Sequence, residues 1–367
     1  MENNILGAFL VALLVSFLVM PLIIGALKKK NLIDAPDRRK IHRTITPSMG
    51  GIGIMIGFVI ALLIWLTFSG IVEYKYVLSG VGLLFVAGLR DDLIPISARV
   101  KLMVQILAAL IVVFTGTIIN SGFGLFGFEE LNFTLRAFLS IGFIIFFTNS
   151  FNLIDGLDGL AGSVTLIISS FFSIWFYVNG SFYLATISGA AAGAIIGFLY
   201  FNWSPAKIFM GDTGALSLGF LFSVLALTFI NQDYALTTEW YKYNAPVATM
   251  IAILIVPLFD TFRIIVVRLV KKKSPFEPDN NHTHHILMRL GLTHAQVAIL
   301  LASFNVVVIA LVTLFRNVGD HVLLPILILG GFFMSVLLDQ LIINKVKTRG
   351  GKKRKKLHQA IKANNEA

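Results

Sequence analysis

The run ILGAFLVALLVSFLVMPLIIGAL (residues 5–27) decides the fold, because it carries no charged side chain over its whole length. A helix of about 20 apolar residues spans the hydrocarbon core of a bilayer, and this run is long enough to do so. Three lysines follow at 28–30, and no A-x-A-like cleavage site precedes them. We therefore expect a retained membrane helix rather than a removed signal peptide.

Similar apolar runs recur along the chain. Apolar residues make up 57% of the 367 residues and charged residues only 13%, about half the roughly 25% of a water-soluble domain. Because hydrocarbon leaves no partner for unpaired backbone groups, we expect an all-α polytopic membrane protein with about eleven transmembrane helices. With no cysteine in the chain, disulfides and thiolate metal sites are excluded. The expected spans are 5–27, 50–69, 76–89, 102–119, 134–150, 161–178, 182–200, 214–231, 246–268, 296–316 and 322–343.

The basic residues predict how these spans are oriented. With the N-terminus outside, 26 of the 30 lysines and arginines fall on the inner side, as the positive-inside rule requires. The C-terminus is then cytoplasmic, and we expect a multi-pass protein of the inner (cytoplasmic) membrane. One transmembrane catalytic domain, 1–343, precedes a basic tail, 344–367, which suits anionic lipid better than nucleic acid. The basic residues left outside are Lys75, Arg136, Lys242 and Arg316.

Five aspartates at predicted cytoplasmic helix ends are candidates for chemistry. Carboxylates at a membrane boundary are costly, so they are functional candidates by default. Such oxygen ligands suit Mg²⁺, or Mn²⁺, together with substrate phosphates. A solvated helix end is the alternative for the first two, and an N-cap is the alternative for the last. The five are Asp91, Asp92, Asp155, Asp158 and Asp212.

The segment NSFNLIDGLDGLAG (149–162) is the most specific string in the chain. Asn152, Asp155 and Asp158 are spaced three residues apart, so a helical turn would place them on one face. The twelve-residue ligand spacing of an EF-hand is missing, which excludes that kind of calcium site. The segment therefore indicates a functional polar site rather than an ordinary loop.

Two further loops carry groups suited to nucleotides and phosphate. The FNWSPAKIFMGDTG segment contains Asn202 and Phe209, an amide and an aromatic ring that suit a nucleobase. The loop DAPDRRKIHRTITPSMGGIGI (34–54) places Lys40 and Arg43 before a glycine-rich turn, and helix N-termini of this kind attract phosphate. Taken alone, this loop is better explained by positive-inside charge and small-residue helix packing.

A histidine motif, HTHHILMRLG, follows a basic run near the inner end of the ninth span. We favour contact with a phosphate-rich substrate over metal ligation, because no thiolate or second histidine cluster completes a zinc site. A merely polar loop is the third alternative. Asp260 and Arg263, three residues apart, are expected to pair with each other, and His294 is assigned no role. The motif histidines are His282, His284 and His285.

Together, these motifs resemble those of a known enzyme family. The ordered set DRRKIH–PSMGG, GLRDDL, NLIDGLDGLAG, FMGDTG and HTHHILMRLG is similar to that of the polyprenyl-phosphate N-acetylhexosamine-1-phosphate transferases (glycosyltransferase family 4, WecA/TagO type, more distantly MraY). The resemblance implies an all-helical fold, Mg²⁺ dependence, a UDP-N-acetylhexosamine donor and an undecaprenyl-phosphate acceptor. It also implies a first step in cell-envelope glycan synthesis, such as teichoic acid or lipopolysaccharide, with a homodimer left open.

The resemblance also assigns roles to individual residues. Asp212 corresponds to the principal Mg²⁺ ligand, Asp91 is the preferred general base or metal orienter, and Phe209 corresponds to a ring that stacks on uracil. The expected catalytic residues are Asp91, Asp92, Asp155, Asp158, His282, His284 and His285. The expected substrate-binding residues are Lys40, Arg43, Lys101, Asn152, Asn202 and Phe209, and the expected metal ligands are Asp212, Asp91 and Asp92.

Several alternatives stay open at this point. The His-Thr-His-His spacing favours GlcNAc-1-phosphate transfer over the MraY-type phospho-MurNAc-pentapeptide transfer, whose enzymes carry three consecutive histidines, but Asn280 after Asp279 keeps a 6-deoxy N-acetylhexosamine open. The lipid phosphate attacks the donor directly or through a phospho-aspartate intermediate. A secondary transporter would instead need acids near span centres and paired half-repeats, whereas here the acids gather at one face.

Overall fold

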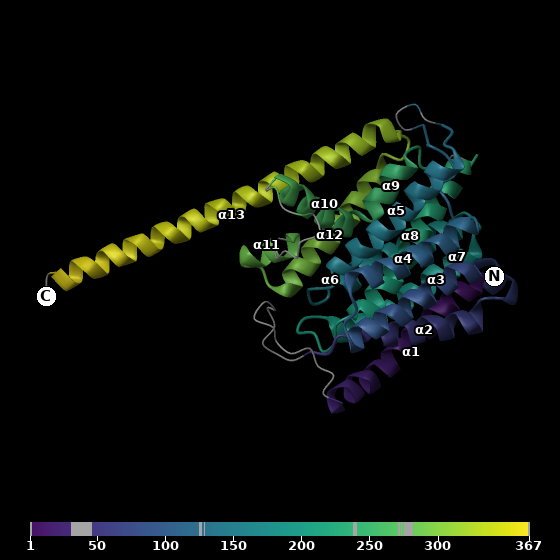
Figure 1. Ribbon diagram of the computed structural model, residues 1–367, viewed down its shortest axis with the longest axis horizontal. Coiled ribbons are helices and arrows are strands. Elements are labelled where there is room, and N and C mark those ends of the chain that lie inside the picture. Colours follow the sequence, from purple (N-terminus) through teal and green to yellow (C-terminus); the bar gives the residue numbers. More distant parts are fainter. Residues whose placement is uncertain are drawn as a thin grey trace.

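The computed structural model describes the backbone of residues 2–30, 46–124, 127, 129–237, 241–270, 272, 274 and 282–365. Over these ranges the chain forms thirteen α-helices and no strand, which confirms the all-helical class. Figure 1 shows most of these helices side by side in one bundle. The helices are α1 (Glu2–Lys29), α2 (Gly50–Trp65), α3 (Phe68–Leu93), α4 (Ala98–Phe114), α5 (Phe133–Leu153), α6 (Leu160–Val178), α7 (Phe182–Asn202), α8 (Gly211–Ala235), α9 (Pro246–Ile253), α10 (Ile255–Val270), α11 (Thr283–Arg289), α12 (His294–Leu314) and α13 (Asp320–Asn365).

Each of the eleven expected spans contains helix, although the lengths differ. Among the described residues, eight helices are long and apolar enough to cross a membrane, and the bent pair α9 and α10 would make a ninth. The other two expected spans are the shorter helices α2, with 16 residues, and α4, with 17. The expected short span 76–89 is the middle of α3, whose 26 residues follow the N-cap Thr67. The chain is a multi-pass membrane protein.

The expected span 246–268 is not one continuous helix, because it breaks into α9 and α10, which meet at 86°. Pro257 lies in the first turn of α10, where its missing N–H needs no partner within the helix. The last carbonyl groups of α9, at Ala252 and Ile253, accept hydrogen bonds of 3.1 and 3.2 Å from the buried Asn305 amide of α12. A polar partner from a neighbouring helix thus satisfies carbonyl groups at the break.

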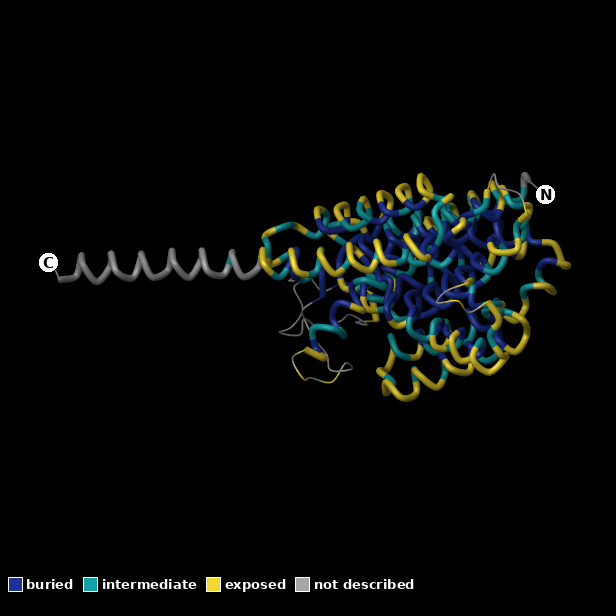
Figure 2. The backbone as a smooth tube through the Cα atoms, turned by 90° about the horizontal axis from the view of Figure 1, so that it is seen from above, coloured by how far each residue is buried: buried dark blue, intermediate teal, exposed yellow. Residues whose placement is uncertain are grey.

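The helix α8 forms the centre of the bundle, and α1 and α13 lie at its margin. Nearly all of α8 is buried, and it packs against α2, α3, α5 and α9. Figure 2 shows a dark blue interior beneath a largely yellow surface. Exposed leucines such as Leu18 and Leu22 of α1 are expected where lipid covers the protein. The polar groups described below are built against one end of α8.

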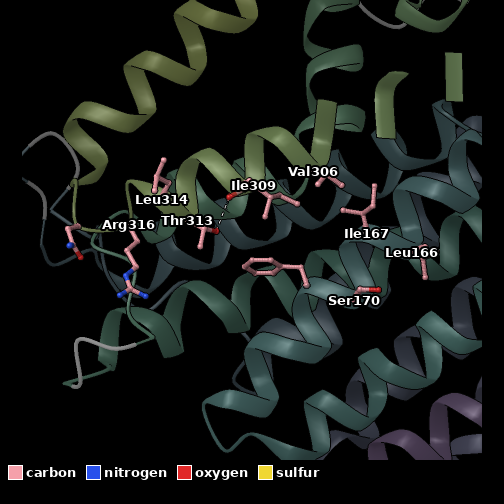
Figure 3. A pocket seen from close by; sticks show the side chains of 11 residues that line it. Leu166, Ile167, Ser170, Val306, Ile309, Thr313, Leu314 and Arg316 are labelled. Atoms are coloured by element: carbon pink, nitrogen blue, oxygen red, sulfur yellow. Dashed lines mark hydrogen bonds between the residues drawn. The ribbon is translucent and has the colours of Figure 1, made fainter. Parts of the chain in front are cut away.

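A crevice of about 860 Å³ opens between α6 and α12 (Figure 3). Its lining is mostly aliphatic, with Thr313 and Arg316 toward one end. Arg316 follows the C-terminal end of α12, whereas the polar loops lie near His294, at the N-terminal end of the same helix. The crevice is therefore separate from the candidate site.

Candidate active site

Two carboxylates from other segments hold the first turn of α8. Asp92, near the end of α3, accepts hydrogen bonds from the backbone N–H groups of Asp212, at 2.9 Å, and Thr213, at 3.0 Å, and from the Thr213 hydroxyl. Asp155, in the turn after α5, accepts one from the Gly211 N–H at 2.8 Å. Because first-turn N–H groups have no partner inside their own helix, both acids act as caps. The N-cap alternative for Asp212 is therefore wrong, since the helix is capped by other residues.

Two glycines permit this close approach. Gly211 has a left-handed φ of 73°, and a Cβ there would lie 2.2 Å from the Ser48 carbonyl oxygen. Gly88 of α3 faces α8, and a Cβ there would lie 2.4 Å from the Asp212 carbonyl oxygen. No larger residue fits either position without moving the backbone. The glycines of the GLRDDL and FMGDTG motifs thus bring the two acidic segments together.

Lys101, near the start of α4, links two of the predicted acids. Its Nζ lies 2.6 Å from Oδ2 of Asp91 and also donates a hydrogen bond to Oδ2 of Asp212. The other oxygen of Asp91 accepts a hydrogen bond of 2.7 Å from the Ile96 N–H, which fixes the loop between α3 and α4. Carboxylates from separate segments therefore converge on one ammonium group, and their convergence on a divalent cation stays a prediction.

We call Asp91, Asp92, Asp155, Asp212 and Lys101 the acidic cluster. Its four carboxylates outnumber its one ammonium group, so like charges repel within it. Burial raises the pKa of the Asp155 carboxyl well above its usual range, and Asp92 and Asp212 raise it further, against the lowering effect of the Gly211 N–H. A cation bound here would relieve this repulsion.

The acidic cluster fits Mg²⁺ if the substrate completes the coordination. In the described part of the chain, no three acidic or histidine side chains form a ready-made metal cage. Asp91 and Asp212 nevertheless supply two neighbouring carboxylates, and Mg²⁺ commonly takes one or two carboxylates together with water and substrate phosphates. Asp92 is already engaged with backbone N–H groups, so its role as a direct ligand stays a prediction.

The segment 154–159 is a turn between α5 and α6, so the expected helical face does not form. As a result, Asp158 has partners different from those of Asp155. Its Oδ2 accepts a hydrogen bond of 3.1 Å from the Ala206 N–H, and its Oδ1 lies 3.3 Å from Nδ1 of His294. His294, which sequence reasoning missed, thus brings the start of α12 to this motif.

Asn202 joins the same turn to the loop before α8. It is buried, and its amide accepts a hydrogen bond of 3.0 Å from the Gly159 N–H and donates one of 2.9 Å to the Ile208 carbonyl. Phe209 and Asn152 are partly exposed near these segments. The contacts of Asn202 support the loop, and base recognition by Asn152, Asn202 and Phe209 stays a prediction.

The histidine motif is anchored by Asp260 of α10. Oδ2 of Asp260 lies 2.9 Å from Nδ1 of His282 and 3.5 Å from Nδ1 of His284, while its Oδ1 accepts a hydrogen bond from the Thr283 N–H. The expected Asp260–Arg263 pair is therefore wrong. Two residues on one helix turn can pair, but here each finds a partner on another helix, and for the buried Arg263 that partner is Asp339 of α13. We call Asp260, His282, His284 and His285 the histidine cluster.

The histidine cluster borders the turn that carries Asp155. A Cβ added at Gly156 would lie 3.6 Å from Nε2 of His284, so that ring nitrogen faces the turn. Burial, reinforced by the charges of His284 and His282, lowers the pKa of His285 to about 4. Lys40 and Arg43, predicted to bind substrate, and Asn280, which bears on the choice of sugar, lie outside the described residues.

Fold and site together define a class: a multi-pass membrane protein with carboxylates, a lysine and histidines gathered at helix ends. The pattern of glycosyl transferase family 4 matches residues 74–230 of the chain. A probable undecaprenyl-phosphate N-acetylglucosaminyl 1-phosphate transferase of Bacillus subtilis is 35% identical over 295 residues, 79% of each chain.

Two other relatives cover the chain to a similar extent. A decaprenyl-phosphate N-acetylglucosaminephosphotransferase of Mycobacterium leprae is 30% identical over 335 residues, 84% of each chain. An undecaprenyl-phosphate alpha-N-acetylglucosaminyl 1-phosphate transferase of Escherichia coli is 30% identical over 285 residues, 75% of this chain and 74% of the relative. The chain belongs to glycosyl transferase family 4, which confirms the family resemblance of its motifs.

Proposed function

We propose that this protein transfers GlcNAc-1-phosphate from UDP-GlcNAc to undecaprenyl phosphate and releases UMP. The observation that carries the proposal is the convergence of Asp91, Asp212 and Lys101 at one end of the membrane helices, where a phosphate on a lipid tail can reach. The relatives, whose names state this activity or its decaprenyl counterpart, support the choice of donor sugar and acceptor.

The proposed chemistry is one displacement at phosphorus. An oxygen of the lipid phosphate attacks the β-phosphorus of the donor, and the bond from that phosphorus to the bridging oxygen breaks. UMP leaves with the bridging oxygen, and the lipid gains the sugar phosphate. A phosphate monoester is already largely ionised near neutral pH, so the protein mainly has to orient two anions and stabilise their charge. A phosphosugar-labelled enzyme formed without lipid would instead support a phospho-aspartate intermediate.

For the cofactor we propose Mg²⁺, with Mn²⁺ as a substitute. Asp212 and Asp91 would hold it, and it would supply charge neutralisation for the donor diphosphate. Lys101 adds positive charge beside the same acids. The excess of carboxylates in the acidic cluster supports this proposal.

The activity is tested by UMP release from UDP-GlcNAc by purified protein in detergent with undecaprenyl phosphate. We expect release that requires both Mg²⁺ and the lipid, and little release from UDP-MurNAc-pentapeptide as a matched donor. Uptake of UDP-GlcNAc into proteoliposomes without UMP release would instead identify a transporter.

We further propose eleven crossings of the cytoplasmic membrane, with the N-terminus outside and the site on the cytoplasmic face. Because the chain has no cysteine, a single introduced cysteine is the only thiol of the protein that a maleimide can label. Lys75 and Arg99 are both exposed and lie at opposite ends of the α3–α4 hairpin. In intact cells a membrane-impermeant maleimide should label Lys75→Cys and spare Arg99→Cys, and the reverse result would contradict the orientation.

A further inference from the structure

Asp260 combines deep burial with several polar partners. Its side chain is almost inaccessible, and its two oxygens face His282, His284 and the Thr283 N–H. These contacts join α10, just after the 86° break, to the start of α11. The carboxylate therefore contacts three consecutive residues at the start of the histidine motif rather than one.

The contacts also determine which ring nitrogen of each histidine faces away from Asp260. Both Nδ1 atoms point toward Asp260, so the Nε2 atoms lie on the far sides of the two rings. The rings of His282 and His284 are nearly parallel, with an interplanar angle of 14° and centroids 5.5 Å apart. Nε2 of His284 faces Gly156, next to Asp155 of the acidic cluster.

A carboxylate that accepts a hydrogen bond from Nδ1–H fixes both the tautomer and the orientation of an imidazole. We propose that Asp260 is a positioning residue for the transfer reaction. It holds His282 and His284 so that their Nε2 atoms face the donor diphosphate in the space beside Asp155. This inference rests on the proposed function and extends it to a residue outside the recognised motifs.

A purely structural tie between helices is the competing explanation. The Thr283 N–H bond alone would be enough to tie α11 to α10, yet one oxygen of Asp260 faces two imidazoles. The neighbouring ion pair of Arg263 with Asp339 ties α10 to α13 without involving any histidine. This pair provides a matched control, because Asp339→Asn makes the same chemical change in an ion pair that includes no histidine.

The test measures kcat and donor KM for UMP release in the wild type, Asp260→Asn, His282→Ala/His284→Ala and the triple variant. Loss of a carboxylate that orients a functional histidine costs about 10- to 100-fold, so we expect that loss in kcat for Asp260→Asn with donor KM changed less than about threefold. In the background without the two histidines, adding Asp260→Asn should lower kcat less than about twofold, because a residue that acts through them has nothing left to orient.

Asp339→Asn should keep kcat within about threefold of the wild type, and Asp260→Glu, which retains the charge, should keep more activity than Asp260→Asn. Equal losses from Asp260→Asn in both backgrounds, or a matching loss in Asp339→Asn, would overturn the inference. If Asp260→Asn does not fold, Asp260→Glu is measured with and without the two histidines: its longer side chain should lower kcat only where they are present, and an equal change in both backgrounds overturns the inference. A wild type that releases no UMP refutes the proposed function itself, which is a separate outcome.

Discussion

The acidic cluster and the histidine cluster use the same side chain, aspartate, for different tasks. Asp92 and Asp155 accept hydrogen bonds from backbone N–H groups and hold the start of α8. Asp260 accepts one backbone hydrogen bond as well, but its other oxygen faces two imidazoles. Asp91 and Asp212 instead share the ammonium of Lys101. The comparison teaches that the partner of a partly or fully buried carboxylate, rather than its position in a motif, indicates whether it anchors the fold, orients another group or binds a cation.

The largest effect is expected at Asp212. Asp212→Asn replaces one carboxylate of the proposed cation position with an amide, and we expect kcat for UMP release to fall by about 10³-fold or more. A full titration with Mg²⁺ should not restore the rate. Near-normal, Mg²⁺-dependent turnover in this variant would show that the acidic cluster does not bind the cation.

A smaller effect is expected at Asp92, because its oxygens are bonded to the α8 backbone. Asp92→Asn should raise the Mg²⁺ concentration for half-maximal activity by about 10- to 100-fold, while saturating Mg²⁺ recovers much of the rate. If saturating Mg²⁺ recovers none of the rate, Asp92 acts as a direct ligand, as its motif predicts. Its role is then to bind the cation and not only to hold the start of α8.

Protons and cations should compete in the acidic cluster. Because the pKa of Asp155 is raised by burial and by its acidic neighbours, it takes up a proton at a higher pH than an ordinary aspartate. The half-saturating Mg²⁺ concentration should therefore increase several-fold as the pH falls from neutral into the mildly acidic range. In Asp155→Asn this dependence should be weaker, and an unchanged dependence would assign the effect to another group.

Pro257 and Asp260 show where sequence reasoning stops. The helical regions could be predicted, because length and apolar content are local properties. The break before Pro257 could not, because the free carbonyl groups there accept hydrogen bonds from Asn305, some fifty residues later. Similarly, the spacing of Asp260 and Arg263 permits a pair on one helix, and only packing of α11 and α13 decides that each binds elsewhere.

The sequence predicted which residues form the candidate site better than it predicted their contacts. Asp91, Asp212 and Lys101 do converge, because alternating spans bring their helix ends to one side. The link between Asp158 and His294 could not be found, since it joins a turn to the start of a helix with no shared motif. Local spacing even misleads in 154–159, where glycines favour a turn over a helix.

The smallest effect is expected in the histidine cluster, on stability. The folded pKa of His285, about 4, lies below the unfolded value of about 6.5, so between these values the unfolded chain binds more protons. The melting temperature should therefore decline as pH falls through this window, and less so in His285→Gln. A decline of equal size in both proteins would assign it to other groups.

The central claim is that the acidic cluster binds the divalent cation and the histidine cluster does not. Electron paramagnetic resonance of Mn²⁺ bound with UDP-GlcNAc tests this directly, through the coupling of the metal to donor phosphorus. We expect the bound signal with phosphorus coupling in the wild type and in His282→Ala/His284→Ala, and its loss in Asp212→Asn. A signal that survives in Asp212→Asn but disappears with the histidines would contradict the account.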